Sequence, residues 1–321
     1  MPFSRIAGTG GYLPPQIVTN QDLERLVDTT DDWIVERTGI RQRHIAKAEC
    51  ASDLALPAAQ RALEMAGRRA DEVDLIVMGT STPDLVFPST ACRLQHKLGI
   101  SQCAALDVNA ACSGFVYALS VADSFIRSGT YQCVLVVGSE VMSRLMDWSD
   151  RTTCVLFGDG AGAMLLEAST EPGIFSTHIH SDAAYEELLY VSGGVSCAVD
   201  PAAQHGAFLR MKGNEVFRFA VNTLGRIVDE TLEANGMRRE DIDWLVPHQA
   251  NIRIIQATAR KLRLPMENVV LTVERHGNTS SASIPLALDE AVRDGRIRRG
   301  DNILMEAFGG GFTWGSALAR F

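Results

Sequence analysis

The feature that most constrains how this chain can fold is an internal repeat. Residues 63–77 (LEMAGRRADEVDLIV) align without a gap with residues 232–246 (LEANGMRREDIDWLV), 169 positions further along. Each copy is typical of a helix end, a turn at a glycine and a buried strand. On this register His248 occupies the position of Gly79, directly after the strand. The repeat predicts two related units that each contain helices and strands.

Two further matches follow in the same order. Residues 112–129 align with residues 278–295, so we expect Asn278 to begin a helix at the position where Cys112 begins one. The glycine-rich motif FGDGAGA resembles the motif FGGGFTWGSALA further along the chain. Three matches in one order indicate that the whole unit is duplicated.

Strands and helices alternate in the manner of an α/β fold in which helices cover a sheet. We expect the two halves to comprise residues 1–171 and 172–321. Apolar runs and helical spacing predict helices at 52–67 and 213–236, buried strands at 73–80 and 133–138, a buried strand that ends at Val108, a strand pair through FGDGAGAMLLE, and an irregular surface segment at 183–207.

Cys112 lies in the motif NAACSG, between the strand that ends at Val108 and helical spacing from Phe115 to Arg127. This places the thiol in the first turn of a helix, where unpaired backbone N–H groups and the helix dipole favour a thiolate. A thiolate at such a turn is a nucleophile suited to thioesters. The alternative is a buried structural cysteine, which is the commoner fate of a free cysteine.

The repeat also predicts a meeting point for three side chains. If the halves pack around a pseudo-twofold axis, Cys112, His248 and Asn278 converge from separate loops. The imidazole N–H and the carboxamide N–H₂ can then donate to one carbonyl oxygen and stabilise an enolate. Taken singly, His248 could be a core histidine and Asn278 a helix cap or a left-handed residue.

Trp33 and Arg37 lie four residues apart in a short predicted helix that Thr29 or Thr30 can cap. An exposed indole beside a guanidinium suits a flat heteroaromatic ring and a phosphate. A packed tryptophan with a solvated arginine is the alternative. Arg151 lies in a polar loop further along.

The composition excludes several classes of protein. The formal net charge of −9 argues against general nucleic-acid binding, and seven scattered cysteines show no metal-ligand spacing. From the residues at its start we expect no signal peptide, and the sequence has no apolar run of the roughly 20 residues that a membrane span needs. We therefore expect a cytoplasmic protein with reduced thiols, no metal and no membrane or nucleic-acid partner.

Two other classes share part of this pattern. A papain-type hydrolase has the same Cys-His-Asn order, but the duplicated α/β pattern and the residues around Cys112 do not fit it. A non-catalytic scaffold would not require these three residues at all. An acyltransferase of the same fold that uses another acceptor stays open, because the three residues do not distinguish it.

The chain resembles a known family, the β-ketoacyl-acyl-carrier-protein synthase III enzymes of the thiolase superfamily. The resemblance covers nearly the whole chain, and it rests on TDDWIVERTGI, NAACSGFVYAL, FGDGAGA, WLVPHQAN, RHGNTSSASIP and FGGGFTWGSA. Other condensing enzymes use Cys-His-His and thiolases carry a second catalytic cysteine, whereas this chain has the asparagine of HGNTS and no cysteine near FGGG. The resemblance implies a thiolase-like fold with a layered α-β-α-β-α core.

The resemblance also implies an activity and a set of site residues. The family transfers an acyl group from acyl-CoA to a cysteine, then condenses it with malonyl-acyl carrier protein, with no cofactor. By resemblance the roles are catalysis by Cys112, His248 and Asn278; an oxyanion hole from the Cys112 and Gly310 amides; adenine between Trp33 and Arg151, with Arg37 on the phosphates; and an acyl pocket at Met142 and at Phe87, which reaches across a homodimer interface.

A carrier protein is acidic, so a basic docking surface is expected on this acidic chain. The helix after HQAN holds Arg253, Arg260 and Lys261, and Arg218 on the preceding long helix can join them. We predict that these four residues form a basic patch beside His248 that binds the carrier protein. The alternative is an ordinary solvated helix face.

Overall fold

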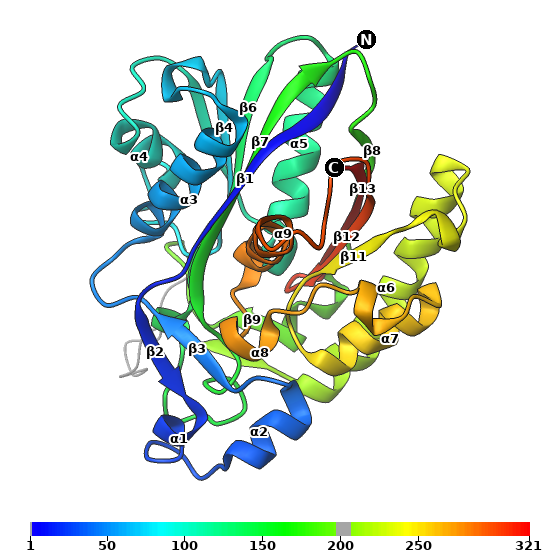
Figure 1. Ribbon diagram of the computed structural model, residues 1–321. Coiled ribbons are helices and arrows are strands. Elements are labelled where there is room, and N and C mark those ends of the chain that lie inside the picture. Colours follow the sequence, from blue (N-terminus) through cyan, green and yellow to red (C-terminus); the bar gives the residue numbers. More distant parts are fainter. Residues whose placement is uncertain (1, 197–206) are drawn as a thin grey trace.

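Two β-sheets form the framework of the protein. The computed structural model describes residues 2–196 and 207–321, within which one sheet has the strand order β1-β7-β6-β4-β5 and the other β11-β12-β13-β8 (Figure 1). The first sheet consists of β1 (Phe3–Tyr12), β4 (Leu75–Gly79), β5 (Ala104–Val108), β6 (Cys133–Val141) and β7 (Asp159–Ser169). The second consists of β8 (Ile174–Ser181), β11 (Trp244–Pro247), β12 (Asn302–Gly309) and β13 (Thr313–Arg320).

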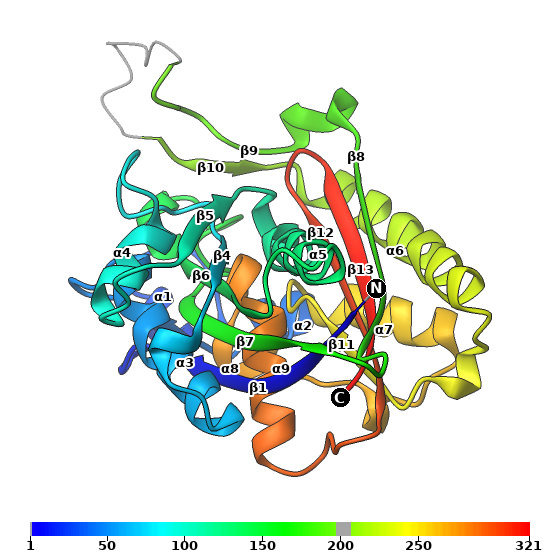
Figure 2. The ribbon, with the colours of Figure 1, turned by 90° about the horizontal axis from the view of Figure 1, so that it is seen from above.

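Helices fill the space between the sheets and cover their outer faces (Figure 2). The central pair is α5 (Gly114–Arg127) and α9 (Ser283–Arg293), the pair on the first sheet is α3 (Ala51–Ala66) and α4 (Thr90–Lys97), and the pair on the second sheet is α6 (Gly213–Asn235) and α7 (Ile252–Leu262). The central layer is fully apolar at its middle, where Phe115 and Leu288 are 0% exposed. The predicted α-β-α-β-α core is confirmed.

A smaller group of elements lies at one end of the layers, at the bottom of Figure 1. It comprises α1 (Asn20–Leu23), α2 (Asp31–Thr38), α8 (Val273–His276) and the hairpin of β2 (Gln16–Thr19) with β3 (Gln42–Ile45). The α2 helix begins where the Thr30 hydroxyl accepts the Trp33 N–H at 3.1 Å, so Thr30 is the predicted cap. None of the helices in the described ranges is long and apolar enough to cross a membrane.

The first repeat is visible in the backbone. Gly67 and Gly236 end α3 and α6 in the left-handed conformation, with φ of 64° and 60°. The 3₁₀ turns Ala70–Glu72 and Arg239–Asp241 follow, and then β4 and β11. These pairs keep the spacing of 169 residues, so the alignment of 63–77 with 232–246 is confirmed. The predicted boundary after residue 171 falls in the turn between β7 and β8.

The second repeat has a different register from the one predicted. Ala111 and Ser280 have φ of 48° and 50°, and each lies in a 3₁₀ turn directly before α5 or α9. The counterpart of Cys112 is therefore Ser281, and Asn278 corresponds to Asn109. The prediction that Asn278 matches Cys112 is wrong because α9 has 11 residues and α5 has 14. In the alignment of residues 112–129 with 278–295, the ends of α5 and α9 coincide, whereas their first residues differ by three positions.

Three other expectations need correction. The strand that ends at Val108 is β5, which is half-buried because it is the last strand of its sheet. FGDGAGAMLLE forms one strand instead of two, because β7 runs through the motif from Asp159. In this strand Gly162 lets α9 approach, since a Cβ there would lie 2.6 Å from the Leu286 nitrogen. The segment 183–207 contains the 3₁₀ stretch Ala183–Leu188 and β9 (Leu189–Val191), which pairs with β10 (Leu209–Met211); residues 197–206 lie outside the described ranges.

Candidate active site

The three residues that the repeat predicts to converge line one cavity. Its volume is about 500 Å³, and its walls include Cys112, His248 and Asn278, which are 8%, 6% and 6% exposed. Trp33 and Arg37 of α2 line the same cavity. The cavity therefore connects a buried thiol with the more exposed group of elements around α2.

Cys112 occupies the middle of the 3₁₀ turn that precedes α5. The turn is forced by the left-handed Ala111, and it is packed against β12, since a Cβ on Gly309 would lie 2.7 Å from the Cys112 nitrogen. Burial raises the pKa of the Cys112 thiol from 9 to about 12, although a hydrogen bond with Ser280 opposes this. Burial therefore opposes the thiolate that a position in the first turn of a helix favours.

His248 follows β11, and its orientation is fixed by a serine. Its Nδ1 lies 2.6 Å from the Ser283 hydroxyl, which also accepts the Gln249 N–H at 3.3 Å. Burial lowers the pKa of His248 to about 3, so the imidazole is neutral at pH 7. In the tautomer in which the Ser283 hydroxyl donates to Nδ1, the ring proton lies on Nε2. The free edge of the ring is then a hydrogen-bond donor.

Asn278 is fixed by its own backbone and by the turn that follows it. Its N–H donates to the Leu156 carbonyl at 2.9 Å, and its carbonyl accepts the Gly158 N–H at 3.0 Å. The side-chain oxygen accepts the Ser280 N–H at 2.9 Å. With the oxygen occupied in this way, the Nδ2 amide is the end that remains to donate to a ligand.

Two buried carboxyl groups near these residues were not found by sequence reasoning. Glu140 of β6 accepts from the hydroxyl groups of Thr82 (2.6 Å) and Ser281 (2.9 Å) and from the Ser81 N–H, and burial raises its pKa. Because Ser281 belongs to the second half of the chain, Glu140 links the two halves. No periodicity or motif distinguishes this glutamate from its apolar neighbours in β6.

Glu306 of β12 lies in the cavity wall. Its carbonyl accepts the His248 N–H at 2.8 Å, its side chain is 1% exposed, and its Oε2 has no partner among the described residues. Burial raises the pKa of Glu306 from 4.5 to about 8, opposed by the Thr258 hydroxyl. At pH 7 the side chain is therefore mainly a neutral acid next to the His248 loop.

Known proteins are similar to this chain in sequence and in fold. Residues 106–183 match the family 3-oxoacyl-[acyl-carrier-protein (ACP)] synthase III, and residues 232–321 match its C-terminal part. The β-ketoacyl-[acyl-carrier-protein] synthase III of Thioalkalivibrio sulfidiphilus is 65% identical over 322 residues, 100% of both chains. The chain belongs to the β-ketoacyl-acyl-carrier-protein synthase III family. The enzyme of Methylococcus capsulatus is 65% identical over 320 residues, 99% of both chains.

Solved structures agree with this membership of the synthase III family. The crystal structure of 3-oxoacyl-[acyl-carrier-protein] synthase III from Aquifex aeolicus has a TM-score of 0.93 at 47% identity, and the match covers 99% of this chain and 100% of that one. A priming β-ketosynthase from a polyketide biosynthetic pathway has a TM-score of 0.95 at 38% identity, with 99% and 96% covered. The thiolase-like fold is thereby established.

The residues that the synthase III resemblance assigns to CoA lie together. The guanidinium carbon of Arg37 lies 4.5 Å from the Trp33 ring centroid, and that of Arg151 lies 4.9 Å from it. Arg151 also donates to the Asp28 carbonyl at 2.6 Å. A flat ring stacked between Trp33 and Arg151 needs about 7 Å between their planes. This is more than the 4.9 Å between the guanidinium carbon of Arg151 and the Trp33 ring centroid.

Gly310, whose amide the resemblance assigns to the oxyanion hole, lies close to the turn that holds Cys112. The Thr313 hydroxyl lies 2.7 Å from the Ala110 carbonyl and 3.3 Å from the Gly310 carbonyl. Gly310 itself packs on β9, because a Cβ there would lie 2.8 Å from the Leu189 carbonyl. The glycine loop and the Cys112 turn are thus tied together through one threonine.

Neither predicted acyl-pocket residue lines the cavity of the single chain. Met142 is 3% exposed and packs in a cluster with Phe157, which does line the cavity. Phe87 is 83% exposed and lies outside the cavity altogether.

The predicted basic patch is smaller than expected. Arg253 lines the cavity and stacks on Phe217, with 5.0 Å between its guanidinium carbon and the ring centroid. Arg218 and Arg260 are exposed. Lys261, however, is paired with Asp229 of α6 at 2.8 Å. Sequence spacing could not show this pair, because it joins two helices.

Proposed function

We propose that this protein catalyses the decarboxylative condensation of an acyl-CoA with malonyl-acyl carrier protein through an acyl-Cys112 intermediate. The product is a β-ketoacyl-carrier protein that begins fatty acid synthesis. One observation carries the proposal: a buried thiol, a neutral imidazole and a carboxamide with a free N–H₂ line the same cavity. Membership of the synthase III family supports the same substrates.

In the first step Cys112 attacks the thioester carbonyl of acyl-CoA. A bond forms between the sulfur and the acyl carbon, and the amides of Cys112 and Gly310 bind the oxyanion. The carbon–sulfur bond to CoA then breaks. The departing CoA sulfur takes up the proton that the Cys112 thiol loses, so the step needs no resting thiolate. At the cavity mouth, Trp33, Arg37 and Arg151 bind the nucleotide part of CoA.

In the second step malonyl-carrier protein occupies the cavity and its carboxylate leaves as CO₂. The electron pair moves into the thioester, and the enolate oxygen accepts from His248 Nε2 and Asn278 Nδ2. The enolate carbon then attacks acyl-Cys112 and expels the sulfur, which takes a proton from solvent. Both donors are neutral, so they stabilise the charge only as it develops and do not hold the malonyl carboxylate as an ion pair.

The proposal includes the surroundings of the reaction. We place it in the cytoplasm, without a cofactor, in a homodimer that docks its carrier protein at Arg253, Arg218 and Arg260. Two features support a homodimer. The half-buried strand β5 ends its sheet, and Phe87, in the loop that leads to α4, is an exposed aromatic side chain.

The test is the intact mass of the protein after incubation with a graded series of acyl-CoAs. We expect one acyl adduct, absent from Cys112→Ser, that malonyl-carrier protein removes with release of β-ketoacyl-carrier protein. An adduct that passes to an amine or alcohol but not to malonyl-carrier protein would indicate a different acyltransferase. Absence of any adduct would refute the proposal.

A further inference from the structure

The group of elements around β3, at the bottom of Figure 1, contains a buried positive charge. Arg43 of β3 is 0% exposed, and it is the largest of the fully buried side chains in the described ranges. Burial lowers the pKa of Arg43 from 12.5 to about 10, so the guanidinium is still charged at pH 7. A buried charge is destabilising unless hydrogen bonds or an ion partner compensate for its lost hydration.

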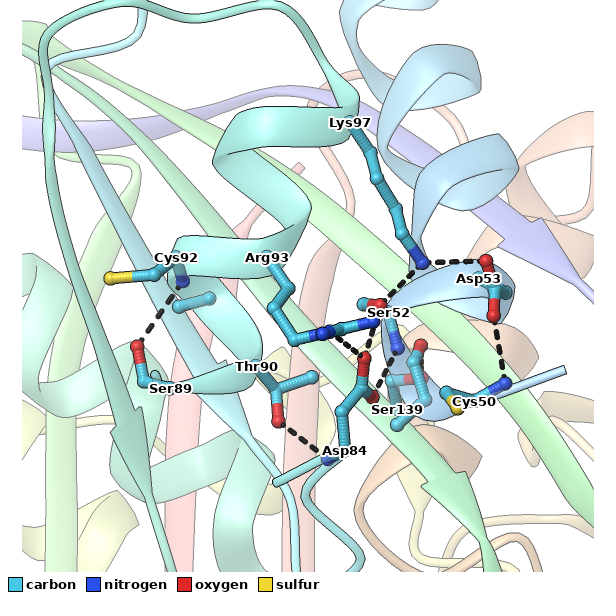
Figure 3. A network of polar contacts seen from close by, with 12 residues as sticks. Cys50, Ser52, Asp53, Asp84, Ser89, Thr90, Cys92, Arg93, Lys97 and Ser139 are labelled. Atoms are coloured by element: carbon cyan, nitrogen blue, oxygen red, sulfur yellow. Dashed lines mark hydrogen bonds and ion pairs between the residues drawn. The ribbon is translucent and has the colours of Figure 1, made fainter. Parts of the chain in front are cut away.

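Two other buried charges of the protein have a partner of opposite sign. Asp84, with 1% of its side chain exposed, pairs with Arg93 at 2.7 Å (Figure 3). Asp123, with 6% of its side chain exposed, pairs with Arg127 at 2.8 Å. Arg43 forms no such ion pair with a described residue, and its Nε has no hydrogen-bond partner there. Its two Nη groups must therefore account for what this charge does.

The Arg43 guanidinium binds two separate parts of the chain. Its Nη1 donates to the Asn20 side-chain oxygen at 2.9 Å and to the Val18 carbonyl at 3.3 Å, both in the group around β3. Its Nη2 donates to the Val155 carbonyl at 2.7 Å. Residues 155–157 line the cavity and lead into β7. One buried side chain thus joins the group around β3 to the wall of the active site.

The same wall segment holds Asn278. The Leu156 carbonyl accepts the Asn278 N–H at 2.9 Å, and the Gly158 N–H donates to the Asn278 carbonyl at 3.0 Å. Two glycines of this contact lie directly on Arg43, since a Cβ at Gly158 or Gly277 would lie 3.0 or 3.1 Å from the Arg43 Cβ. Arg43 therefore supports the turn at Asn278 by a hydrogen bond to the wall segment and by direct packing.

We propose that Arg43 is a positioning residue that holds Asn278 where its amide donates to the enolate oxygen. The inference rests on the proposed function, in which Asn278 acts in condensation and not in the transfer of the acyl group to Cys112. Arg43 does not line the cavity, so it acts only through the residues that it holds. A misplacement of about 1 Å in such a donor can slow a step by about 10²-fold.

The experiment measures the two steps separately in the full-length Arg43→Lys variant. The single lysine nitrogen replaces two Nη groups, so it does not hold the Asn20 oxygen and the Val155 carbonyl in the same geometry. We expect the condensation of preformed acetyl-Cys112 enzyme with malonyl-carrier protein to slow by about 10- to 100-fold. Acyl transfer from acetyl-CoA, followed by intact mass, should change little.

The matched control is Arg127→Lys. Arg127 also joins two elements through a backbone carbonyl, that of Ile174 at 2.7 Å, but it lies outside the cavity wall. This control should leave both steps near the parent rate. A loss of condensation equal to that of Arg43→Lys would overturn the inference, because any disturbed arginine would then slow the reaction.

The decisive comparison is the double variant Arg43→Lys with Asn278→Ala. If Arg43 acts through Asn278, the double variant condenses no more slowly than Asn278→Ala alone, because the residue that Arg43 positions is already absent. A merely structural role of Arg43 would instead lower the rate again by the factor seen in Arg43→Lys. Such multiplied losses overturn the inference.

Circular dichroism and urea unfolding show whether each variant is folded. If Arg43→Lys does not fold, Arg43→Met decides, because an apolar chain of similar length removes the buried charge altogether. A folded variant that condenses at the parent rate overturns the inference, and so does failure of both variants to fold, since Arg43 then serves the fold as a whole. Failure of the parent protein to form or condense the acyl adduct would refute the proposed function instead.

Discussion

The two elbows, the turns from Asn109 to Cys112 before α5 and from Asn278 to Ser281 before α9, share a left-handed third residue and differ in chemistry. In both, an asparagine oxygen accepts the N–H two residues on, Ala111 at 3.3 Å from Asn109 and Ser280 at 2.9 Å from Asn278. In the first elbow the asparagine is exposed and the fourth residue, Cys112, lines the cavity. In the second elbow it is the asparagine, Asn278, that lines the cavity.

The fourth residue of the second elbow, Ser281, has no such freedom. Its hydroxyl lies 2.8 Å from the Gly79 carbonyl and 2.9 Å from Glu140. The comparison shows that a duplicated turn supplied one reactive position from each copy, and that the unused position in the second copy became a structural hydrogen bond. Whether a position of the turn lines the cavity or is structural therefore depends on the hydrogen bonds that its surroundings offer.

The largest expected effect comes from exchanging Cys112 and Ser281, the fourth residues of the two elbows. Cys112→Ser should lower kcat by about 10⁴-fold or more, because the hydroxyl is a far weaker nucleophile. The double variant Cys112→Ser with Ser281→Cys should be equally inactive, since position 281 faces Glu140 and not the cavity. Recovery of activity in the double variant, measured as β-ketoacyl product, would show that the elbows are interchangeable.

The next effect compares the two buried carboxyl groups. Glu306 has a folded pKa of about 8 against 4.5, so between these values the folded state holds a proton that the unfolded state lacks. Stability therefore falls as pH rises through this window, by about 1.4 kcal/mol per unit and at most about 5 kcal/mol. The Glu306→Gln variant should lack this fall in stability with pH, and near pH 8 it should unfold at a higher urea concentration than the parent protein.

Glu140 supplies the matched control for that measurement. Its oxygens accept from several hydroxyl and N–H donors, so the NH₂ group of Glu140→Gln would face donors and destabilise the protein by about 1–3 kcal/mol. Urea unfolding at several pH values tests both variants. Two shifts of the same sign would contradict the distinction between a satisfied and an unsatisfied carboxyl.

A third prediction concerns the two asparagines. Asn278→Asp keeps the oxygen that accepts from Ser280 but replaces the donor with a negative oxygen, so condensation should slow by about 10²–10³-fold. Acyl transfer to Cys112, followed by mass, should change little. Asn109→Asp makes the same exchange in the exposed copy and should leave both steps near the parent rate. Equal losses in both variants would mean that the turn itself is being damaged.

The smallest expected effect is on stability. Ser281→Ala removes the donor to Gly79 and Glu140 and should lower the free energy of unfolding by about 1–3 kcal/mol. Chemical denaturation measures the loss, and the acyl-transfer rate of the folded protein should be retained. An unchanged midpoint would show that Ser281 contributes nothing to the joint between the halves.

Much of the architecture could be predicted from the sequence, because buried strands and amphipathic helices leave clear periodicities. The alignment of 63–77 with 232–246 correctly placed His248 after its strand. The sequence alignment paired the wrong residues of the two elbows because α9 is three residues shorter than α5. Three residues are close to one helical turn, so the later residues of the two helices still aligned on the same face. An ungapped comparison cannot see a deletion of that size.

The features of the site that escaped prediction depend on surroundings rather than on residue type. The thiol of Cys112 was expected to ionise from its place in a turn, but its pKa follows from burial, which spacing does not report. Lys261 was assigned to a free patch although Asp229 on another helix pairs with it. Glu140, Glu306 and Ser283 carry no local signal, since each acts through contacts with distant parts of the chain.

The high pKa of Cys112 has a consequence for how the protein ages. Oxidants and alkylating reagents attack the thiolate form, so a nucleophile that is held as a thiol between turnovers reacts with them slowly. Cys50, Cys92 and Cys103 are only half-buried, so reagents reach these sulfur atoms more easily than that of Cys112. The same burial that delays ionisation thereby shields the reactive sulfur from chemical damage while no substrate is bound.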